Sequence, residues 1–267
     1  MKKRLTLKLT VFLLLFSGGC QLLAPPTNPH LLLGNPSDAN ESANNFLIEK
    51  PQYSLSYNRD RGTPNWVAWQ LNNKWFGEVE RQNDFDPDES LPATWYRVRP
   101  TDYTNSGYDR GHMTPSADRT ATVEDNQATF LMTNIVPQTP KNNRGAWKNL
   151  EEYSRELVKA GKELYIYAGV YGDKEKIGSN KQVVAPSYTW KIVVVFDRPG
   201  MGLRDISENT RIIAVDVPNR KNTSSDWERY LVSVDAIENK TGYDFLDRVS
   251  PAIQKAIESK IDSGESK

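Results

Sequence analysis

Apolar runs separated by polar and turn-forming stretches predict strands on both sides of a helical middle. Some runs alternate apolar and polar side chains, as half-buried strands do, and others are continuously apolar and β-branched, as buried central strands are. We predict strands at residues 53–57, 66–71, 95–99, 164–168, 190–196, 211–215 and 230–234.

Residues 143–160 form the strongest predicted helix, because apolar side chains recur at helical spacing and Gly161 is placed to end it. Shorter helices are predicted at 125–133 and from 245 onward, most clearly at 251–261. Strands before and after a helical middle indicate an α+β fold, with a central, largely antiparallel sheet flanked by helices.

The first 19 residues have the features of an export signal. Lys2, Lys3 and Arg4 precede an apolar run at 9–16 and small residues at 17–19. The apolar run is shorter than the about 20 residues that cross a bilayer, and a buried N-terminal helix is the alternative. We therefore expect a protein that works outside the cytoplasm, whether secreted, periplasmic or anchored by lipid.

Cys20 is the only cysteine, so no intramolecular disulfide can form. Its place after the small residues resembles a bacterial lipoprotein processing site, although Ser17 stands where such sites usually carry leucine. A lipid anchor at Cys20 and a freely secreted, cleaved protein both stay open. Residues 20–46 are rich in turn formers and predict a solvated linker that includes His30, followed by one globular domain at 47–267.

The charge of the chain is balanced, with 34 basic and 34 acidic side chains. Without the four basic residues of the leader, 30 basic side chains remain against 34 acidic ones. Bulk charge therefore gives no sign of nucleic-acid binding, which would need a local basic cleft. Nothing in the sequence indicates an obligate oligomer.

His112 is the candidate for acid–base chemistry, because it is the only histidine in the predicted domain. An unperturbed histidine pKa of about 6.5 suits proton transfer near neutrality. The residue follows Gly111, which permits close backbone approach, and the charged pair Asp109 and Arg110. Taken alone, such a histidine is more often structural than catalytic.

Asn143, Glu151 and Arg155 are the candidates for a metal site, since their spacing places them near one face of a helix. An amide oxygen and a carboxylate suit a hard divalent cation such as Mg²⁺. On spacing alone, a helix cap at Asn143 and an exposed salt bridge between Glu151 and Arg155 are the more frequent explanations.

Several motifs between Asp109 and Glu151 stand in a recognisable order. They are residues 109–119, 130–134, 137–140 and 142–144, followed by Trp147, Leu150 and Glu151. The series resembles the signature of the DNA/RNA non-specific endonucleases, which are ββα-metal (His-Me finger) nucleases, and especially their sugar-non-specific cyanobacterial members. The resemblance runs from about Tyr53 to the last predicted helix, and several motifs in order are far more specific than one.

The resemblance implies an endonuclease that depends on Mg²⁺, with Mn²⁺ as an alternative, and cuts DNA and RNA with little sequence preference. His112 corresponds to the general base, Asn143 to the sole direct protein ligand of the metal, and Glu151 to a carboxylate that hydrogen-bonds the metal's waters. Cleavage is expected to leave 5′-phosphate and 3′-hydroxyl ends. Because His112 must be neutral, activity should fall below about pH 6.5, unless a neighbour lowers the pKa of the histidine.

Four further residues match the family's pattern. Arg81 and Arg155 correspond to arginines that contact the phosphate, and Arg81 has the weaker local support because no basic cluster surrounds it. Asp109 and Arg110 correspond to motif residues that orient the site. The ββα motif would place His112 at or just after a strand end and Asn143 on the facing helix.

Two other functions stay open: a catalytically inert nucleic-acid-binding or adhesion module, and a nuclease or phosphodiesterase restricted to one substrate class. A zinc hydrolase is disfavoured, since one histidine and no cysteine in the predicted domain cannot form the usual site. No Gly-x-Ser-x-Gly elbow supports a Ser-His-Asp hydrolase. A proteinaceous inhibitor that protects the producing cell is a further candidate partner.

Overall fold

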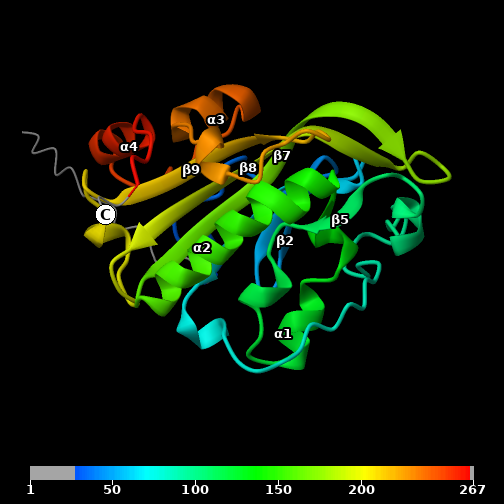
Figure 1. Cartoon of the computed structure of the whole chain (residues 1–267), viewed down its shortest axis with the longest axis horizontal. Coiled ribbons are helices and arrows are strands. Elements are labelled where there is room, and N and C mark those ends of the chain that lie inside the picture. The colour runs from blue at the N-terminus through cyan, green and yellow to red at the C-terminus, as the bar shows by residue number, and fades with distance from the viewer. Residues whose placement is uncertain (1–27, 265–267) are drawn as a thin grey trace, which may run out of the picture.

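The computed structural model describes residues 28–264, so the predicted export signal and Cys20 lie outside the described part of the chain. The fold is α+β, as predicted, with a seven-stranded antiparallel sheet and helices on both faces (Figure 1). No helix within residues 28–264 is both long enough and apolar enough to cross a membrane.

The main sheet has the strand order β1-β2-β3-β4-β7-β8-β9, and β5 pairs with β6 in a separate antiparallel ribbon. Five of the predicted strands lie in β3, β4, β7, β8 and β9. The strands are β1 Glu41–Ser42, β2 Asn45–Glu49, β3 Ser54–Asn58, β4 Thr63–Leu71, β5 Asp109–His112, β6 Ile135–Gln138, β7 Glu163–Ile177, β8 Val183–Phe196 and β9 Arg211–Pro218.

Four α-helices and several short turns of helix complete the fold. The α-helices are α1 Val123–Ala128, α2 Lys148–Lys159, α3 Val234–Thr241 and α4 Pro251–Glu258. The short turns are η1 Pro29–Leu31, η2 Asn73–Trp75, η3 Pro100–Tyr103, η4 Ser116–Asp118, η5 Met132–Asn134, η6 Asn142–Trp147, η7 Leu203–Asp205 and η8 Trp227–Tyr230. The helix predicted at 125–133 is thus shorter and starts earlier, and the helix predicted from 245 onward is confined to α4.

Side chains that alternate across the main sheet create two apolar cores. On β4, Val67 and Trp69 belong to the core under α2, whereas Trp66 and Ala68 belong to the core under α3 and α4. Figure 1 shows α2 lying along one face of the sheet, with α3 and α4 on the other. Burial of each large apolar side chain, such as Leu150 of α2, contributes about 1.5–3 kcal/mol. The first of these cores therefore fixes α2 firmly against the sheet.

The helix predicted at 143–160 has an irregular start. Residues Asn142–Trp147 form a π-helical turn, and regular α2 begins only at Lys148. Gly145 interrupts the turn with φ −108° and ψ −114°. Its α-carbon faces Ser225, whose own α-carbon would lie 3.3 Å from an added β-carbon. Wide turns of this type are frequent at functional sites.

Two predicted strands are wrong, because local capping begins a helical turn within or just after each of them. At 95–99, the backbone N–H of Arg99 donates to the Asp102 carboxylate at 2.8 Å, and the chain turns into η3. At 230–234, only a single bridge joins Leu231 to Val215 of β9. The hydroxyl of Ser233 then accepts a hydrogen bond from the first turn of α3 and so begins a helix. The pattern of apolar residues does not predict either of these side-chain caps.

The predicted linker is wrong for residues 28–46, which belong to the folded domain. Leu31 enters the core under α3 and α4. His30, expected to be solvated, is 1% exposed. Its Nε2 donates to the Pro51 carbonyl at 2.8 Å, and its Nδ1 accepts from the Gln70 N–H at 3.1 Å. The turn-forming residues therefore shape an ordered segment that crosses β4.

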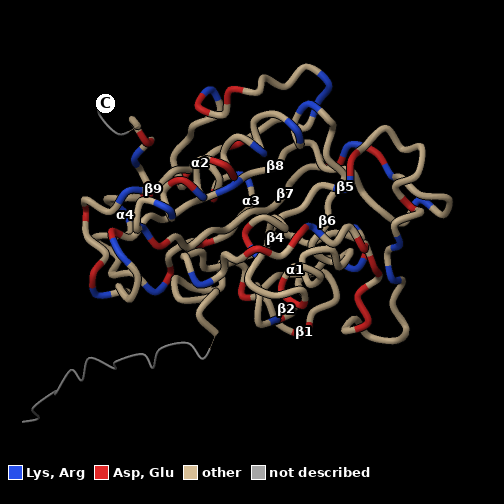
Figure 2. The backbone as a smooth tube through the Cα atoms, turned by 60° about the horizontal axis from the view of Figure 1, so that its bottom comes forward, with Lys and Arg blue, Asp and Glu red and all other residues tan. Residues whose placement is uncertain are grey.

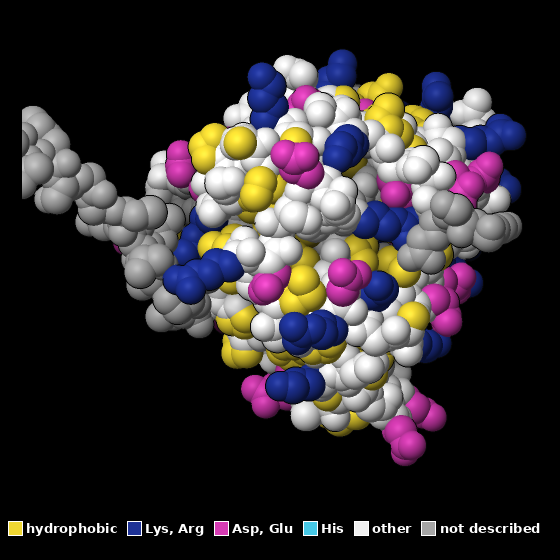
Figure 3. Space-filling model, turned by 90° about the vertical axis from the view of Figure 1, so that its left-hand side faces the viewer, with side chains coloured by type: hydrophobic (Ala, Val, Ile, Leu, Met, Phe, Trp, Pro, Cys, Tyr) yellow, Lys and Arg dark blue, Asp and Glu magenta, His cyan; other side chains and the backbone are white. Residues whose placement is uncertain are grey.

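Charge is distributed evenly over most of the molecule. Figure 2 shows basic and acidic positions intermixed along the backbone, and Figure 3 shows both signs interspersed on one face. A basic surface for nucleic acid must therefore be local, as the balance of charges requires.

Candidate active site

The ribbon β5-β6 and the following helix form a ββα unit around His112. His112 is the last residue of β5 and pairs with Ile135 of β6. The indole N–H of Trp147 donates to the His112 carbonyl at 3.1 Å, which ties the start of α2 to the end of the strand. Gly111 faces the Gln138 side chain so closely that an added β-carbon would overlap the amide. A larger residue at this position would therefore have to displace the buried side chain of Gln138.

His112 is neutral and has a free ring nitrogen. The residue is 8% exposed, and its ring packs edge-on against Phe130 at a centroid distance of 4.9 Å. Its Nε2 has no hydrogen-bond partner within residues 28–264. Burial, followed by the positive charges of Arg81 and Arg110, lowers the pKa of His112 to about 3. Because burial and the two arginines lower the pKa of His112 this far, protonation of His112 should not reduce the activity near pH 6.5.

Asp109 orients Asn143. The Asn143 amide nitrogen donates to Asp109 Oδ2 at 3.0 Å, and the same carboxylate accepts two hydrogen bonds from Arg144, at 2.8 and 2.7 Å. The amide nitrogen is thereby occupied, and the amide oxygen is left to bind another group. Asn143 lies within the π turn and does not cap α2.

Glu151 and Arg155 lie one turn apart on α2, and each has its own buried partner. Arg155 pairs with Asp118 at 3.0 Å, so the alternative of an exposed Glu151–Arg155 salt bridge is wrong. Glu151 is 13% exposed and lies 3.5 Å from the ammonium of Lys191 on β8. Burial raises the pKa of Glu151 to about 7, although Lys191 opposes the rise, and burial lowers the pKa of Lys191. The Lys191 ammonium also lies 4.0 Å over the Trp147 ring.

A pocket of about 280 Å³ brings most of the predicted residues together. Six of the seven line it: Arg81, Arg110, His112, Asn143, Glu151 and Arg155. The seventh, Asp109, lies behind Asn143 through the hydrogen bond described above. Arg81, the least supported of the set by sequence, therefore lies in the same pocket as His112.

The lining of this pocket carries five basic side chains and one acidic one. The basic residues are Arg81, Arg110, Arg144, Lys148 and Arg155. It is thus a local basic cleft of the kind that a protein of balanced charge needs in order to hold a polyanion. A larger cavity of about 790 Å³ shares Arg110 but is also lined by Asp84, Asp86 and Glu124. Those carboxylates would repel phosphate.

Three residues of the site were missed by the sequence reasoning. Arg144 and Lys148 precede Glu151 by seven and three residues, the spacing of one helix face, so a helical projection would have found them. Lys191 is a lone charge in the apolar run 190–196, which is the signal of a buried cation with a partner. Nothing in the sequence indicated that the partner is Glu151.

Residues 35–252 match the family model described as DNA/RNA non-specific endonuclease. The chain belongs to this family. A non-specific endonuclease of this type is a nuclease, that is, a phosphodiester hydrolase, and the α+β fold and the resemblance expected from sequence are both confirmed.

This endonuclease is 59% identical to a nuclease of Nostoc sp. over 244 residues, 90% of the chain and 89% of the relative. It is 30% identical to human mitochondrial endonuclease G over 219 residues, which cover 76% of the chain and 70% of the relative. Among solved structures, a complex described as EndoG/EndoGI, with the mechanism of EndoG inhibition, matches with a TM-score of 0.70 and 26% identity. That match covers 83% of this chain and 91% of the other.

Proposed function

We propose that this chain is an exported, Mg²⁺-dependent endonuclease that hydrolyses DNA and RNA with little sequence preference and leaves 5′-phosphate and 3′-hydroxyl ends. One observation carries the proposal: a neutral histidine with an unpartnered nitrogen and an oriented asparagine oxygen line one basic pocket.

His112 is the general base. Its pKa of about 3 keeps the ring neutral throughout the physiological range, and its buried Nε2 is free to accept a proton from a water in the pocket. The oxygen of that water attacks phosphorus, the bond from phosphorus to the 3′ oxygen breaks, and the 3′ oxygen takes up a proton from solvent. General-base catalysis of this kind contributes about 10²–10⁴-fold.

Asn143 is the residue that would hold a divalent cation directly, and Glu151 would hold the cation through its waters. The Asn143 oxygen is free because Asp109 occupies the amide nitrogen, and the Glu151 carboxylate lines the same pocket. Both are hard oxygen donors, which suits Mg²⁺ and also Mn²⁺, and a site with so few protein ligands suits a cation that keeps several waters. When bound, the cation supplies positive charge that stabilises the phosphate and the departing oxygen.

The arginines around the pocket bind the phosphate. Arg155 is largely buried, so its charge acts more strongly on a bound anion than an exposed charge does. Arg81 is exposed and lines the same pocket. Contacts to phosphate rather than to base edges carry no sequence information. Little base preference, and acceptance of both DNA and RNA, follow from such contacts.

Location and partners complete the proposal. The export features of residues 1–19 and the position of Cys20 support secretion, with or without a lipid anchor. Replacement of Cys20 by serine would move an anchored protein from the membrane fraction to the soluble fraction and would leave a freely secreted protein where it is. The inhibitor in the EndoG complex supports a proteinaceous inhibitor as a candidate partner.

The test is digestion of supercoiled plasmid, single-stranded DNA and RNA by the purified protein in Mg²⁺ or in EDTA. We expect cleavage of all three with Mg²⁺, none with EDTA, and a loss of about 10²–10⁴-fold in His112→Ala. Lys159→Ala, at the far end of α2 and outside the pocket, is the control and should cleave normally. Binding without cleavage by folded wild type would replace the proposal with an inert binding module, and cleavage of one polymer only would restrict the substrate class.

A further inference from the structure

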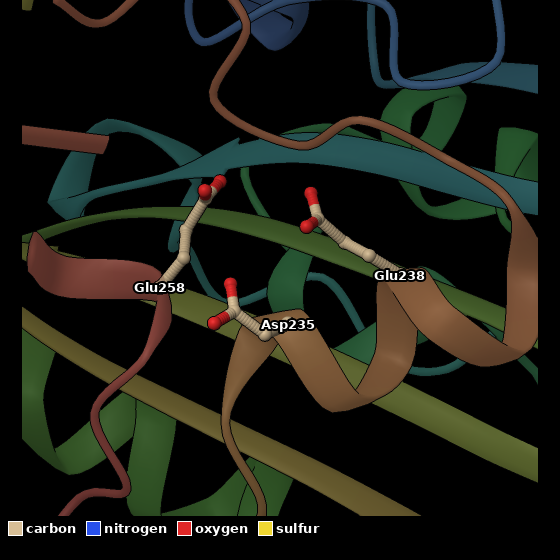
Figure 4. A group of neighbouring side chains, drawn as sticks. All are labelled: Asp235, Glu238 and Glu258. Atoms are coloured by element: carbon tan, nitrogen blue, oxygen red, sulfur yellow. The ribbon is translucent and has the colours of Figure 1, made fainter. Parts of the chain in front are cut away.

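Three carboxylates meet on the face of the sheet opposite the active site. Asp235 and Glu238 lie three residues apart on α3, and Glu258 is the last residue of α4. One oxygen of each lies within 4.8 Å of the others. Figure 4 shows the three side chains converging on the space between the two helices. Neither helix contributes to the nuclease pocket.

Among the three carboxylates, Glu258 is the one whose burial needs an explanation. The residue is only 4% exposed, and its Oε1 has no hydrogen-bond partner within residues 28–264. Glutamate is almost never fully buried unless it is paired. The residue also ends α4, where the helix dipole disfavours negative charge. A buried carboxylate oxygen directed at two further carboxylates therefore calls for a positive partner.

Within residues 28–264, the charges that act on Glu258 are all negative, and only the neutral side chain of Gln254 favours its charged form. Burial raises the pKa of Glu258 to about 8, and the charged groups that add to the rise are Glu238, Asp235 and Asp244. Burial, Asp244 and Asp235 likewise raise the pKa of Glu238, whose Oε1 accepts a single hydrogen bond, from the Phe245 N–H at 2.8 Å. Acidic groups thus surround the gap between α3 and α4.

We propose that Asp235, Glu238 and Glu258 form a divalent-cation site and that Ca²⁺ is the cation it binds. Ca²⁺ takes oxygen ligands at about 2.3–2.6 Å, so two ligands on opposite sides of the ion lie about 4.6–5.2 Å apart. The oxygens of this cluster, within 4.8 Å of one another, fit that span without rearrangement. Mg²⁺ binds at about 2.0–2.1 Å, demands octahedral geometry and retains its waters, so it fits the cluster less well.

Such a site would join α4 to α3 and so fix the C-terminal helix against the sheet. The match to the endonuclease family ends at residue 252, so Glu258 lies beyond the matched region. The site would therefore act on the stability of the fold, since no residue of α3 or α4 lines the nuclease pocket.

The site is tested by thermal unfolding of the Asn143→Ala protein in EGTA and in 10 mM CaCl2. The substitution removes the proposed metal ligand of the nuclease pocket, so that Ca²⁺ binding there does not contribute to the result. For a weak site with a Kd of about 10⁻⁴–10⁻³ M, Ca²⁺ should raise Tm by at least about 3–6 °C. Adding Glu258→Gln should abolish the rise, whereas Glu208→Gln, an exposed carboxylate elsewhere, should preserve it. MgCl2 at the same concentration should give a smaller rise.

The metal-free proteins provide an independent check, because Glu258→Gln removes a buried repulsive charge. In EGTA at pH 8.5 this variant should unfold at or above the Tm of its parent, and in CaCl2 the order should reverse. No calcium-dependent rise in the Asn143→Ala protein would overturn the proposal, as would an equal rise with and without Glu258→Gln. Asp235→Asn, partly exposed, serves if Glu258→Gln fails to fold.

Discussion

At the scale of single residues, the pH dependence of the nuclease should follow Glu151 and not His112. The pKa of His112 is about 3, so the base is neutral at every working pH, whereas the pKa of Glu151 is about 7. As the pH falls through 7, Glu151 gains a proton and loses its charge. We therefore expect kcat/KM, measured at subsaturating Mg²⁺, to fall below about pH 7.

The variant Glu151→Gln checks this assignment. Its rate should be about 10–100-fold lower, as for other groups that orient a metal's surroundings, and the fall with pH should be absent. A fall that survives the substitution would assign it to another group.

Asp109 should control metal affinity although it lies outside the pocket lining. Asp109→Asn removes the charge that holds the Asn143 amide and the Arg144 guanidinium. We expect the Mg²⁺ concentration for half-maximal rate to rise about 10–100-fold. Glu156→Gln, an exposed carboxylate on α2, should leave it unchanged. A lower maximal rate at unchanged Mg²⁺ dependence would instead show that Asp109 acts on the substrate.

The sequence predicts those residues of the site that belong to short motifs in a fixed order. His112 and Asn143 stand in an ordered series of short motifs, and the structure places both at one pocket. Lys191 was not foreseeable as a partner of Glu151, because strand β8 approaches α2 only through the packing of the sheet. The depressed pKa of His112 likewise depends on its burial and then on Arg81, which is distant in sequence.

At the scale of elements, the N-terminal segment should make the fold sensitive to acid. Burial lowers the pKa of His30 to about 4, so the neutral ring is stabilising above its unfolded pKa of about 6.5. That contribution is lost as the pH falls from about 6.5 to 4, and the shift corresponds to about 3 kcal/mol.

Denaturant unfolding of wild type and His30→Gln between pH 7 and 4 measures this effect. The variant should be less stable at pH 7, because it loses the paired ring, and the difference should shrink as the pH falls. A difference that is constant with pH would mean that His30 binds its proton equally well in the folded and unfolded states, so that burial does not lower its pKa.

Elements were predicted well where burial determined the pattern and poorly where local hydrogen bonds did. The apolar runs became β7, β8 and β9 because their side chains fill both cores. The segment at 28–46 looked like a linker because proline and asparagine also shape ordered turns. The segment is buried because it packs against β4, which is distant in sequence. Patterns among neighbouring residues do not predict such a contact.

At the scale of the whole molecule, a basic pocket on a chain of balanced charge should give nuclease activity a modest dependence on salt. Lys148 lines the pocket, whereas Lys159 has a similar surface salt bridge outside it. We expect Lys148→Ala to lower kcat/KM equally for DNA and RNA, and to reduce the slope of log kcat/KM against log salt by about 1. Lys159→Ala should change neither quantity, and a selective loss on one polymer would mean that Lys148 contacts more than phosphate.

The buried lysine of β8 also bears on how the sheet reaches its alignment. Neighbouring residues Trp190 and Lys191 point to opposite faces, one into the apolar core under α3 and α4 and the other toward Glu151. A slip of β8 by a single residue would exchange them and leave an unpaired ammonium among hydrocarbon side chains, at a cost of several kcal/mol. The ion pair of Lys191 with Glu151 thus disfavours a misaligned β8 during folding. A hydrophobic replacement of Lys191 would remove both this penalty on misalignment and the partner of Glu151.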